Sequence, residues 1–409
     1  MPGLRCWQRK LFARVKMKAY QIKPQVYWVG AIDWSLRTFH GYVTDRGSSY
    51  NAYLIIDEKI TLIDNVKSYL VEEMMARIAS VIDPSQIEII ISNHGEPDHS
   101  GSIKELIKLA PKAKIYAQAP NGVKILQATY GDLPIVPVKN GEQLKIGKRT
   151  LSFYHAPMVH WPDNMVVYDQ EDKILFSNDI FGQHMASSER FDGDLPLEMI
   201  LFEAKKYYAN IVLPYTKQAA RIFAAAKELD IKMIATSHGI IWRDHLPEIF
   251  QLYEYLTQSQ KQTKAVVVYD TMWQSTEKIA VEIAETFSEL AIPVRLYNIN
   301  DTDASNIMTE IIDAKYLAVG SSTINNNMLP TIAGFLCYLK GLAPVGLSSF
   351  AFGSYGWGGQ SIAQIEEQLD TLGFKRLMPG IRINYVPKPE DLKQIHDDIA
   401  QALHQAKTV

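Results

Sequence analysis

Two histidines and two carboxylates lie within six residues of one another, at the end of an apolar segment. They are His94, Glu96, Asp98 and His99. Imidazole nitrogens and carboxylate oxygens are the donors that divalent metals such as zinc, iron and manganese take from proteins. Side chains of this kind held on one turn would repel or stay hydrated unless a cation lies between them. Because the chain has only 10 histidines in 409 residues, the cluster predicts a metal site.

Three later segments each place a possible ligand directly after a predicted strand. The residues are His160, Asp179 and His238. Polar residues end strands in many sheet proteins, so each one alone is weak evidence. Together with the first cluster they supply up to four imidazoles and three carboxylates. This set is large enough for two metals, with Asp179 as the natural bridging carboxylate.

A second candidate site lies in the C-terminal part of the chain. Residues 266–280 predict a strand, a loop and a helix, with hydroxyl groups at Thr271, Ser275 and Thr276. These hydroxyls and the free amides of the helix start suit a phosphate, although ordinary helix capping is the alternative. The loop has glutamine at position 274 rather than glycine.

Two more loops, residues 320–326 and 353–359, follow later strands. In an open parallel sheet such loops meet at one crevice, and Trp273, Tyr355 and Trp357 offer flat surfaces for an isoalloxazine ring. We expect FMN, because a Gly-X-Gly-X-X-Gly dinucleotide motif is not apparent. The expected contacts are Thr271, Met272, Trp273, Gln274, Ser275, Thr276, Ser321, Ser322, Thr323, Ile324, Asn325, Asn326, Gly353, Ser354, Tyr355, Gly356, Trp357 and Gly358.

The elements that position these residues fall into two domains. Residues 17–257 alternate short strands with helices and hairpins, which predicts a mixed α and β domain. Residues 258–264 are polar and predict a linker. Residues 265–409 repeat strand, loop and helix, the pattern of an open parallel α/β sheet. Residues 1–16 are basic; a dispensable extension is favoured over a targeting peptide.

The composition excludes several classes of protein. A net charge of −3 gives no reason to expect a nucleic-acid partner. Two cysteines, Cys6 and Cys337, are too few for a disulfide framework or an iron–sulfur cluster, which favours a cytoplasmic protein. The longest apolar runs fall short of the roughly 20 residues that cross a membrane, so no membrane association is expected.

The order of the ligand motifs resembles that of the flavodiiron proteins, also called A-type flavoproteins. The motifs are His-X-Glu-X-Asp-His at 94–99, His-Trp-Pro-Asp at 160–163, Ser-Asn-Asp at 177–179 and Ser-His-Gly at 237–239. The resemblance covers the chain from Met17. It implies a metallo-β-lactamase-like αββα sandwich followed by a flavodoxin-like doubly wound parallel sheet. In hydrolases of this fold the second motif position is histidine and the metal is zinc; Glu96 favours iron or manganese instead.

The resemblance also implies roles for single residues. One iron would be bound by His94, Glu96 and His160, and the other by Asp98 and His238, with Asp179 between them. His99 holds a motif position and either ligates iron or turns away. His40 and Tyr207 are candidates to donate protons near the irons, and packing roles are the alternative. The assignment to Tyr207 rather than Tyr208 is open, and His184 is a further candidate neighbour of the irons.

Electron counting joins the two sites into one function. Reduction of dioxygen to water takes four electrons, and reduction of two nitric oxide molecules to nitrous oxide takes two. A diferrous pair holds two electrons, and a reduced flavin holds two more. We therefore expect an oxygen or nitric oxide reductase recharged by FMN. The alternatives are a zinc metallohydrolase with an appended flavodoxin-like binding domain and a flavin electron carrier whose first domain is a scaffold.

The resemblance implies partners as well. The external donor would be a rubredoxin-like protein or a reduced deazaflavin or nicotinamide system. A head-to-tail homodimer, or a dimer of such dimers, would bring the flavin of one chain beside the irons of the other.

Overall fold

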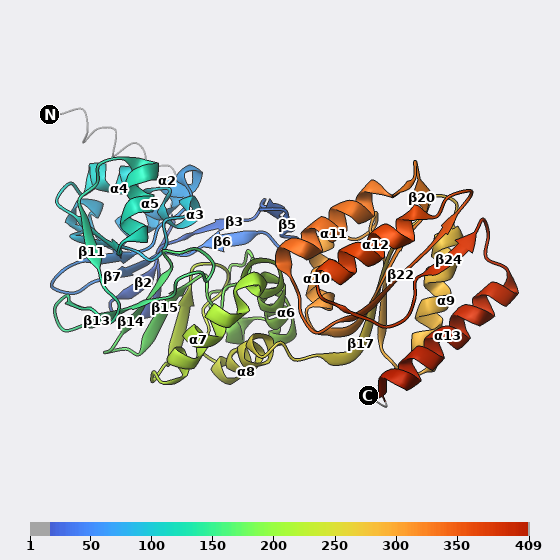
Figure 1. Ribbon diagram of the computed structural model, residues 1–409. Helices are drawn as coiled ribbons and strands as arrows, with labels where there is room; N and C mark the ends of the chain where they lie inside the picture. Colours follow the sequence, from blue (N-terminus) through green and yellow to red (C-terminus); the bar gives the residue numbers. More distant parts are fainter. Residues whose placement is uncertain (1–16, 408–409) are drawn as a thin grey trace. The chain divides into compact units, whose positions relative to one another are not determined.

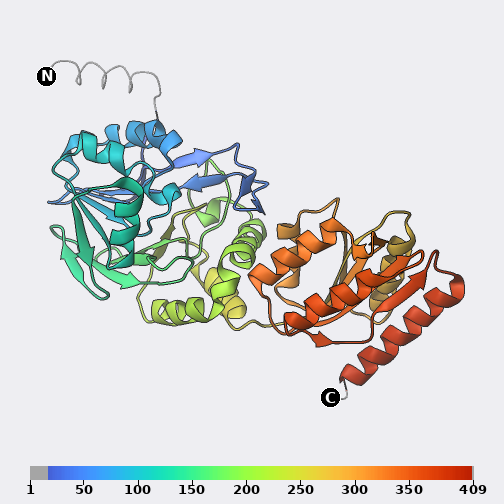
Figure 2. The ribbon, with the colours of Figure 1, turned by 45° about the horizontal axis from the view of Figure 1, so that its top comes forward.

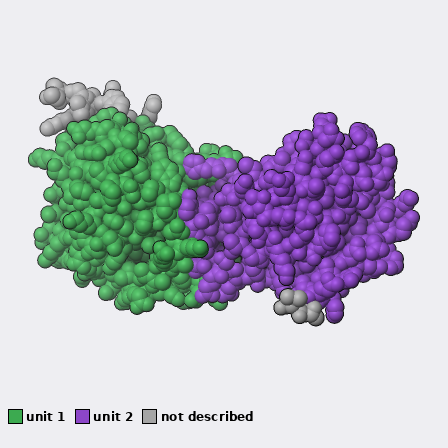
Figure 3. All heavy atoms as spheres, viewed as in Figure 1, with its two compact units in different colours: residues 1–39, 44–207, 217–254 green, residues 40–43, 208–216, 255–409 purple. Residues whose placement is uncertain are grey.

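The computed structural model describes residues 17–407, which form two compact units (Figures 1 and 3). The first unit, green in Figure 3, comprises the described residues up to Phe39, Thr44–Tyr207 and Lys217–Glu254. The second unit, purple, comprises His40–Val43, Tyr208–Thr216 and the described residues from Tyr255 onward. The basic segment 1–16 lies outside the described residues.

The first unit is built on two sheets. The seven-stranded sheet has the order β1 (Tyr20–Lys23), β2 (Val26–Trp28), β7 (Tyr53–Ile55), β8 (Thr61–Ile63), β9 (Ile89–Ser92), β10 (Lys114–Gln118) and β11 (Ile135–Val138). The five-stranded sheet has the order β12 (Gln143–Lys145), β13 (Thr150–His155), β14 (Met165–Asp169), β15 (Ile174–Asn178) and β16 (Met233–Thr236). Two short strands, β3 (Ala31–Asp33) and β6 (Ser48–Tyr50), pair separately.

Apolar side chains from both sheets fill the space between them. Ile63 and Ile91 of the first sheet pack in one core cluster with Phe153 and Phe176 of the second. The first sheet is covered on its other face by α2 (Val71–Ala79), α4 (Ile103–Leu109) and α5 (Asn121–Tyr130). On the side of the second sheet lie α6 (Leu197–Tyr207), α7 (Thr216–Lys227) and α8 (Leu246–Thr257) (Figure 1). The layers are therefore α, β, β and α, which confirms the expected sandwich.

Strand β9 shows why the sequence folds in this way near the first ligand cluster. All four of its residues, Ile89–Ser92, are buried, and it pairs in parallel with β8 and β10. A β-branched, continuously apolar run suits a strand that is covered on both faces. The short helix α3 (Pro97–Ser100) follows within a few residues. The ligand cluster thus begins where a rigid central strand ends.

The second unit contains one six-stranded parallel sheet. Its strands are β18 (Val294–Asn298), β17 (Gln262–Asp270), β19 (Ala314–Ser321), β22 (Ser348–Tyr355), β23 (Lys375–Arg376) and β24 (Ile381–Asn384), the last two both paired with β22. The helices are α9 (Ser275–Glu289), α10 (Ala304–Ile311), α11 (Pro330–Leu342), α12 (Gln360–Thr371) and α13 (Pro389–Lys407), and they cover both faces of the sheet (Figures 1 and 2). The order β18–β17–β19–β22–β24 is that of a flavodoxin-like fold, as expected.

The structure differs from the sequence expectation around the predicted linker. Strand β17 begins at Gln262, so part of segment 258–264 belongs to the sheet. Lys264 explains this polar start, because its buried ammonium pairs with Glu310 at 2.8 Å and Asp313 at 2.7 Å. A polarity pattern alone cannot distinguish a paired lysine in a strand from a solvated one in a linker. No helix within residues 17–407 has the length and apolar character to span a membrane.

Candidate functional site

The predicted metal ligands converge at the carboxyl ends of strands in the first unit. His94, Glu96, Asp98 and His99 follow β9, Asp179 follows β15, and His238 follows β16. His160 lies in the loop between β13 and β14. All seven are buried or nearly so, and they form two groups. The structure thus brings together every metal-binding residue that the sequence predicts.

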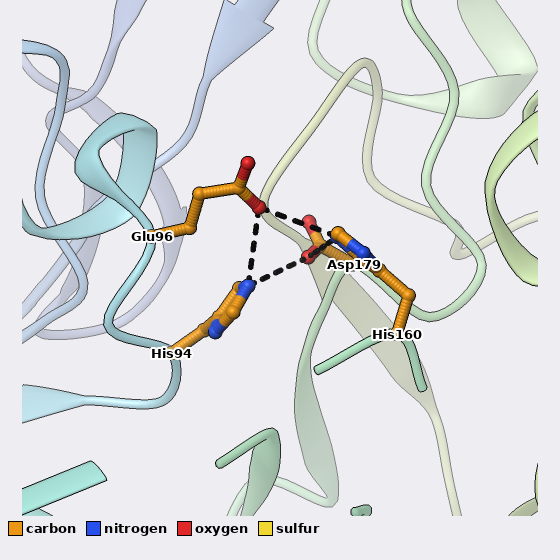
Figure 4. A group of neighbouring side chains, drawn as sticks. All are labelled: His94, Glu96, His160 and Asp179. Carbon is orange, nitrogen blue, oxygen red and sulfur yellow. Dashed lines mark hydrogen bonds and ion pairs between the residues drawn. The ribbon is translucent and has the colours of Figure 1, made fainter. Parts of the chain in front are cut away.

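The first group comprises His94, Glu96, His160 and Asp179 (Figure 4). The Nε2 atoms of His94 and His160 lie 3.2 and 3.3 Å from the same oxygen, Oε2 of Glu96. One ligand atom from each residue lies within 4.8 Å of the others. Figure 4 shows the four side chains pointing toward a common centre. Two imidazoles and two carboxylates around one point suit a divalent metal ion.

The second group comprises Asp98, His99 and His238. The Nε2 atom of His99 lies 3.4 Å from Oδ1 of Asp98, and Nε2 of His238 lies 3.4 Å from Oδ2 of the same residue. The ring of His99 therefore faces into the pocket rather than away from it. Of the two possibilities left by the sequence, this orientation favours ligation by His99.

Asp179 lies between the two groups. Its Oδ2 is 3.9 Å from Nε2 of His94 and 3.5 Å from Nε2 of His160. Its Oδ1 is 2.9 Å from Nε2 of His99 and 3.3 Å from Nε2 of His238. Each carboxylate oxygen thus faces a different pair of imidazoles. This is the geometry required of a carboxylate that bridges two metal ions.

The buried carboxylates of the pocket are arranged as metal ligands rather than as hydrogen-bond acceptors. The carboxylate oxygens of Asp98 and Asp179 are buried, yet within the described chain no well-aligned hydrogen bond reaches them. Burial by itself raises the pKa of Asp179, but His99, His160 and His238 together hold it well below its ordinary value. Burial lowers the pKa of His238, but Asp179 and Asp98 raise it to about 10. Carboxylates and imidazoles that attract one another without aligning are typical of ligands arranged around cations.

Further buried groups orient the ligands. Oδ1 of Asp163 lies 3.0 Å from Nδ1 of His94, and Oδ2 accepts a hydrogen bond of 2.6 Å from the amide of Gly95. The backbone oxygen of Ser49 lies 2.8 Å from Nδ1 of His238. Such contacts hold the other ring nitrogen, Nε2, free for a metal. The roles of Asp163 and Ser49 were not predicted, although Asp163 is part of the His-Trp-Pro-Asp motif.

The structure distinguishes the two candidate tyrosines, Tyr207 and Tyr208, by their positions. The ring of Tyr207 is buried, 6.0 Å from that of His238, and burial raises its pKa well above the ordinary value. Tyr208 instead donates a hydrogen bond of 3.2 Å to Thr216, within the second unit. Of the two tyrosines, Tyr207 is therefore the one beside the ligands.

The two candidate histidines differ in position. His184 is buried, with its ring 4.6 Å from that of His238 and its Nδ1 2.8 Å from Oγ of Ser48. Burial and the neighbouring His238 hold its pKa well below the ordinary value. His40 is exposed, has a φ of 51°, and groups with the second unit. A catalytic role for His40 or Tyr207 stays a prediction.

The second unit has a cavity of about 550 Å³ at the ends of its parallel strands. Twelve of the expected flavin contacts line it: Met272, Trp273, Ser275, Ser322, Thr323, Asn325, Asn326, Ser354, Tyr355, Gly356, Trp357 and Gly358. Trp273 and Trp357 are 86% and 93% exposed, which leaves their rings available to a ligand. A flat aromatic ligand with a phosphate fits this combination of rings and hydroxyls.

Three loops meet at the buried hydroxyl of Thr276. Its Oγ1 lies 2.9 Å from Oγ of Ser322 and 3.0 Å from Oγ of Ser354. Gln274, just before α9, has a φ of 64°, a left-handed conformation that favours glycine. The hydroxyl of Thr271 is buried and has no hydrogen-bond partner among residues 17–407. An unpaired buried hydroxyl beside a helix start suits a phosphate ligand.

Six expected residues do not line this cavity: Thr271, Gln274, Thr276, Ser321, Ile324 and Gly353. The buried hydroxyl of Ser321 accepts a hydrogen bond from the amide of Leu329 at 2.9 Å, so its role here is structural. Tyr385 and Val386 line the cavity but were not predicted. They follow the short strand β24, which the sequence pattern did not reveal.

Comparisons with known proteins identify both domains. Residues 49–239 match the model of the ODP family beta lactamase, and residues 267–397 match that of flavodoxin. The chain is 41% identical to the rubredoxin-oxygen oxidoreductase of Megalodesulfovibrio gigas, over 95% of this chain and 98% of that protein. It is 39% identical to the nitric oxide reductase of Moorella thermoacetica, over 92% of this chain and 96% of that one.

A solved structure gives the same result. The flavodiiron protein of Giardia intestinalis superposes with a TM-score of 0.92 at 33% identity, covering 96% of this chain and 98% of that one. The likeness therefore extends through both domains. This chain belongs to the flavodiiron protein family.

Proposed function

We propose that this protein is an oxidoreductase that reduces dioxygen to water, nitric oxide to nitrous oxide, or both, at a pair of non-haem irons. The position of Asp179 between the two ligand groups is the observation that carries the proposal. Glu96 supports iron, because a carboxylate in place of an imidazole makes the site harder and suits the ferric state. His99 joins Asp98 and His238 as a ligand of the second iron.

The residues around the centre have separate tasks. The irons would bind and reduce the gas, and FMN would recharge them from an external donor. Asp163 and the backbone of Ser49 fix the rings of His94 and His238. Tyr207 remains protonated at neutral pH, since burial raises its pKa, and can donate a hydrogen bond beside the second ligand group. His40 is the second candidate proton donor.

The FMN would lie in the crevice of the second unit. The hydroxyls and amides at the start of α9 would bind the phosphate, and Trp273, Tyr355 and Trp357 would contact the isoalloxazine ring. Because these rings and hydroxyls come from separate loops, bound flavin would hold the loops in one arrangement.

The partners of the reaction follow from its electron demand. A rubredoxin-like protein, or a reduced deazaflavin or nicotinamide system, would supply electrons. The name of the M. gigas relative, rubredoxin-oxygen oxidoreductase, supports the first of these donors. A head-to-tail homodimer or a dimer of such dimers would bring the flavin of one chain beside the irons of the other, in a cytoplasmic protein.

Substitution of Asp179 by alanine tests the proposal. The purified wild-type protein should be yellow and contain two irons and one flavin per chain. In an oxygen-free solution with a chemically reduced donor, it should consume dioxygen or nitric oxide when either gas is added. The Asp179→Ala variant should lose both gas activities and retain its flavin. Gas consumption by an Asp179→Ala protein at the wild-type rate would contradict the proposal, and a colourless zinc protein would support a metallohydrolase.

A further inference from the structure

A cation lies against the wall of the cavity in the second unit and has no task in the account so far. None of the residues that line this cavity has a charged side chain. Arg382, on β24, is not among them, but its guanidinium carbon lies 5.7 Å from the centre of the Tyr355 ring. Tyr355 itself lines the cavity. A cation within roughly 6 Å of an aromatic ring is attracted to it.

The sheet explains why Arg382 and Tyr355 meet. Strand β24 pairs in parallel with β22 (Figure 1), and Arg382 is the pairing partner of Gly353, two residues before Tyr355. Strand β22 ends at Tyr355, so the guanidinium lies near the carboxyl end of that strand. Ligands of open parallel sheets bind outside the carboxyl ends of the strands.

The residues after Arg382 hold the backbone of Tyr355. The amide of Tyr385 donates a hydrogen bond of 2.7 Å to the backbone oxygen of Tyr355. Nδ2 of Asn384 donates one of 2.7 Å to the backbone oxygen of Gly356 and a longer one of 3.3 Å to that of Tyr355. The segment that carries the Tyr355 ring is therefore fixed to the strand that carries the cation.

Glycine at position 359 leaves room for this contact. Gly359 has a φ of 107°, and a Cβ atom there would lie 2.8 Å from Nη2 of Arg382 and 3.2 Å from Cγ of Tyr355. A side chain at this position would displace the guanidinium, in addition to the strain of a left-handed backbone. Arg382 and Tyr355 thus both pack against the backbone of Gly359.

The charge of Arg382 is not cancelled by an ion pair. Arg376, on the neighbouring strand β23, pairs with Glu366 and Asp370. Arg382 forms no such pair with any carboxylate in the described part of the chain, 17–407. Its side chain is exposed, so water and salt screen its charge. A positive charge thus remains beside the aromatic wall of an otherwise uncharged cavity.

We propose that Arg382 raises the reduction potential of the flavin, acting through the ring of Tyr355. The inference rests on the flavin site of the proposed function, in which FMN occupies this cavity and an external donor supplies electrons. Oxidised FMN takes up two electrons and one proton, and its isoalloxazine ring changes from neutral to singly negative. A positive charge near the ring stabilises the reduced form more than the oxidised form.

Arg382 is thus a positioning residue of the flavin site. Its charge makes the flavin easier for the donor to reduce. A single screened charge near a protein surface changes such an equilibrium by about fivefold. For a two-electron couple, a factor of five corresponds to about 20 mV.

Reductive titration of the full-length protein loaded with FMN tests the proposal. Dithionite supplies the electrons, and a reference dye reports the potential. Arg382→Gln should lower the ratio of reduced to oxidised flavin affinity about fivefold, and the two-electron potential by about 20 mV. Arg382→Lys keeps the charge and should restore most of the difference. Fluorescence titration should show an affinity for oxidised FMN within about twofold of the wild type for both variants.

Arg295→Gln is the matched control, because it removes the same charge elsewhere in the second unit. Arg295 is exposed on β18, the strand at the opposite edge of the sheet. This variant should keep the wild-type potential. Because the Arg382 side chain is exposed, the difference between the wild type and Arg382→Gln should shrink as the salt concentration approaches about 1 M.

The outcomes separate the role of Arg382 from the function it serves. A wild-type protein that binds no FMN would overturn the flavin site of the proposed function and this inference with it. Bound FMN with an unchanged affinity ratio in Arg382→Gln would overturn the inference alone. Equal weakening of oxidised and reduced FMN would do the same, since Arg382 would then only support the Tyr355 ring. So would a shift of equal size in Arg295→Gln, because net charge would explain it.

Discussion

Asp64 and Asn93 are joined by two hydrogen bonds, from the backbone amide of Asn93 at 2.8 Å and from its Nδ2 at 3.1 Å. The same carboxylate accepts hydrogen bonds of 3.3 Å from Asn178 and from Ser237. Each donor directly precedes a metal ligand, respectively His94, Asp179 and His238. Asp64 therefore connects three ligand-bearing loops from both sheets.

Replacement of Asp64 by alanine should destabilise the first unit and disorder the metal centre. Three buried donors would lose their acceptor and the Nδ2 of Asn178 would keep only Ser237, at a cost of about 2–5 kcal/mol. Urea unfolding measures the loss, and metal analysis should show a lower iron content. Asp132→Ala, at an exposed position, is the control and should change neither quantity. A fully iron-loaded Asp64→Ala protein of wild-type stability would show that Asp64 does not position the ligands.

Replacement of Glu96 by histidine should change the metal preference. An imidazole in place of this carboxylate softens the first group and favours zinc over iron. The variant is loaded with equal concentrations of zinc and iron, and elemental analysis measures the ratio of bound zinc to bound iron. This ratio should be higher than in the wild type. Glu96→Asp keeps the carboxylate and serves as the control. An unchanged ratio in Glu96→His would refute the argument that the carboxylate selects iron.

Replacement of Trp357 by alanine should weaken flavin binding without weakening the fold. The side chain is 93% exposed, so its loss removes little packing within the protein. Loss of an aromatic contact to the flavin ring should lower FMN affinity about tenfold, or ~1.4 kcal/mol. Fluorescence titration of the flavin-free protein measures the affinity, and thermal unfolding without flavin measures the stability. Unaltered affinity would place the isoalloxazine ring elsewhere.

Asp57 should make a small, pH-dependent contribution to stability. Its carboxylate accepts hydrogen bonds from the amides of Glu58, Lys148 and Arg149 at 2.8, 3.1 and 2.9 Å. Burial alone raises its pKa, but these amide donors lower it below the ordinary value of 3.8. A carboxyl with a lowered folded-state pKa stabilises the protein above its unfolded-state pKa. That stability is lost as the pH falls through the folded-state value.

The Asp57→Asn variant tests this direction of the pH dependence of stability. The variant should be less stable than wild type by about 1 kcal/mol or less at pH 7, because Asp57 is only partly buried and solvent screens its charge. The difference in the free energy of unfolding should shrink as the pH falls below 4. Urea unfolding between pH 7 and pH 3 measures it, and a difference that grows toward low pH would contradict the assignment.

Much of the fold and of the metal centre could be predicted because the signals are local. The isoleucine run of β9 and the ligands after it are adjacent in sequence. The assignment of ligands to two groups came instead from the family resemblance. Spacing alone does not tell which oxygen of Asp179 faces which histidine.

Other features depend on contacts between distant segments. Tyr385 reaches the cavity of the second unit through β24, a strand of four residues that pairs with β22. Asp64 acquires its role only when Asn93, Asn178 and Ser237 are folded around it. In the sequence it is one more polar residue at the end of an apolar run, and its partners are up to 173 positions away.

The most direct test of the diiron account is anomalous diffraction from crystals of the iron-loaded protein, measured at the iron and zinc edges. The account predicts two iron peaks per chain, one among His94, Glu96 and His160 and the other among Asp98, His99 and His238, with Asp179 between them. A single peak, or a signal at the zinc edge only, would contradict it.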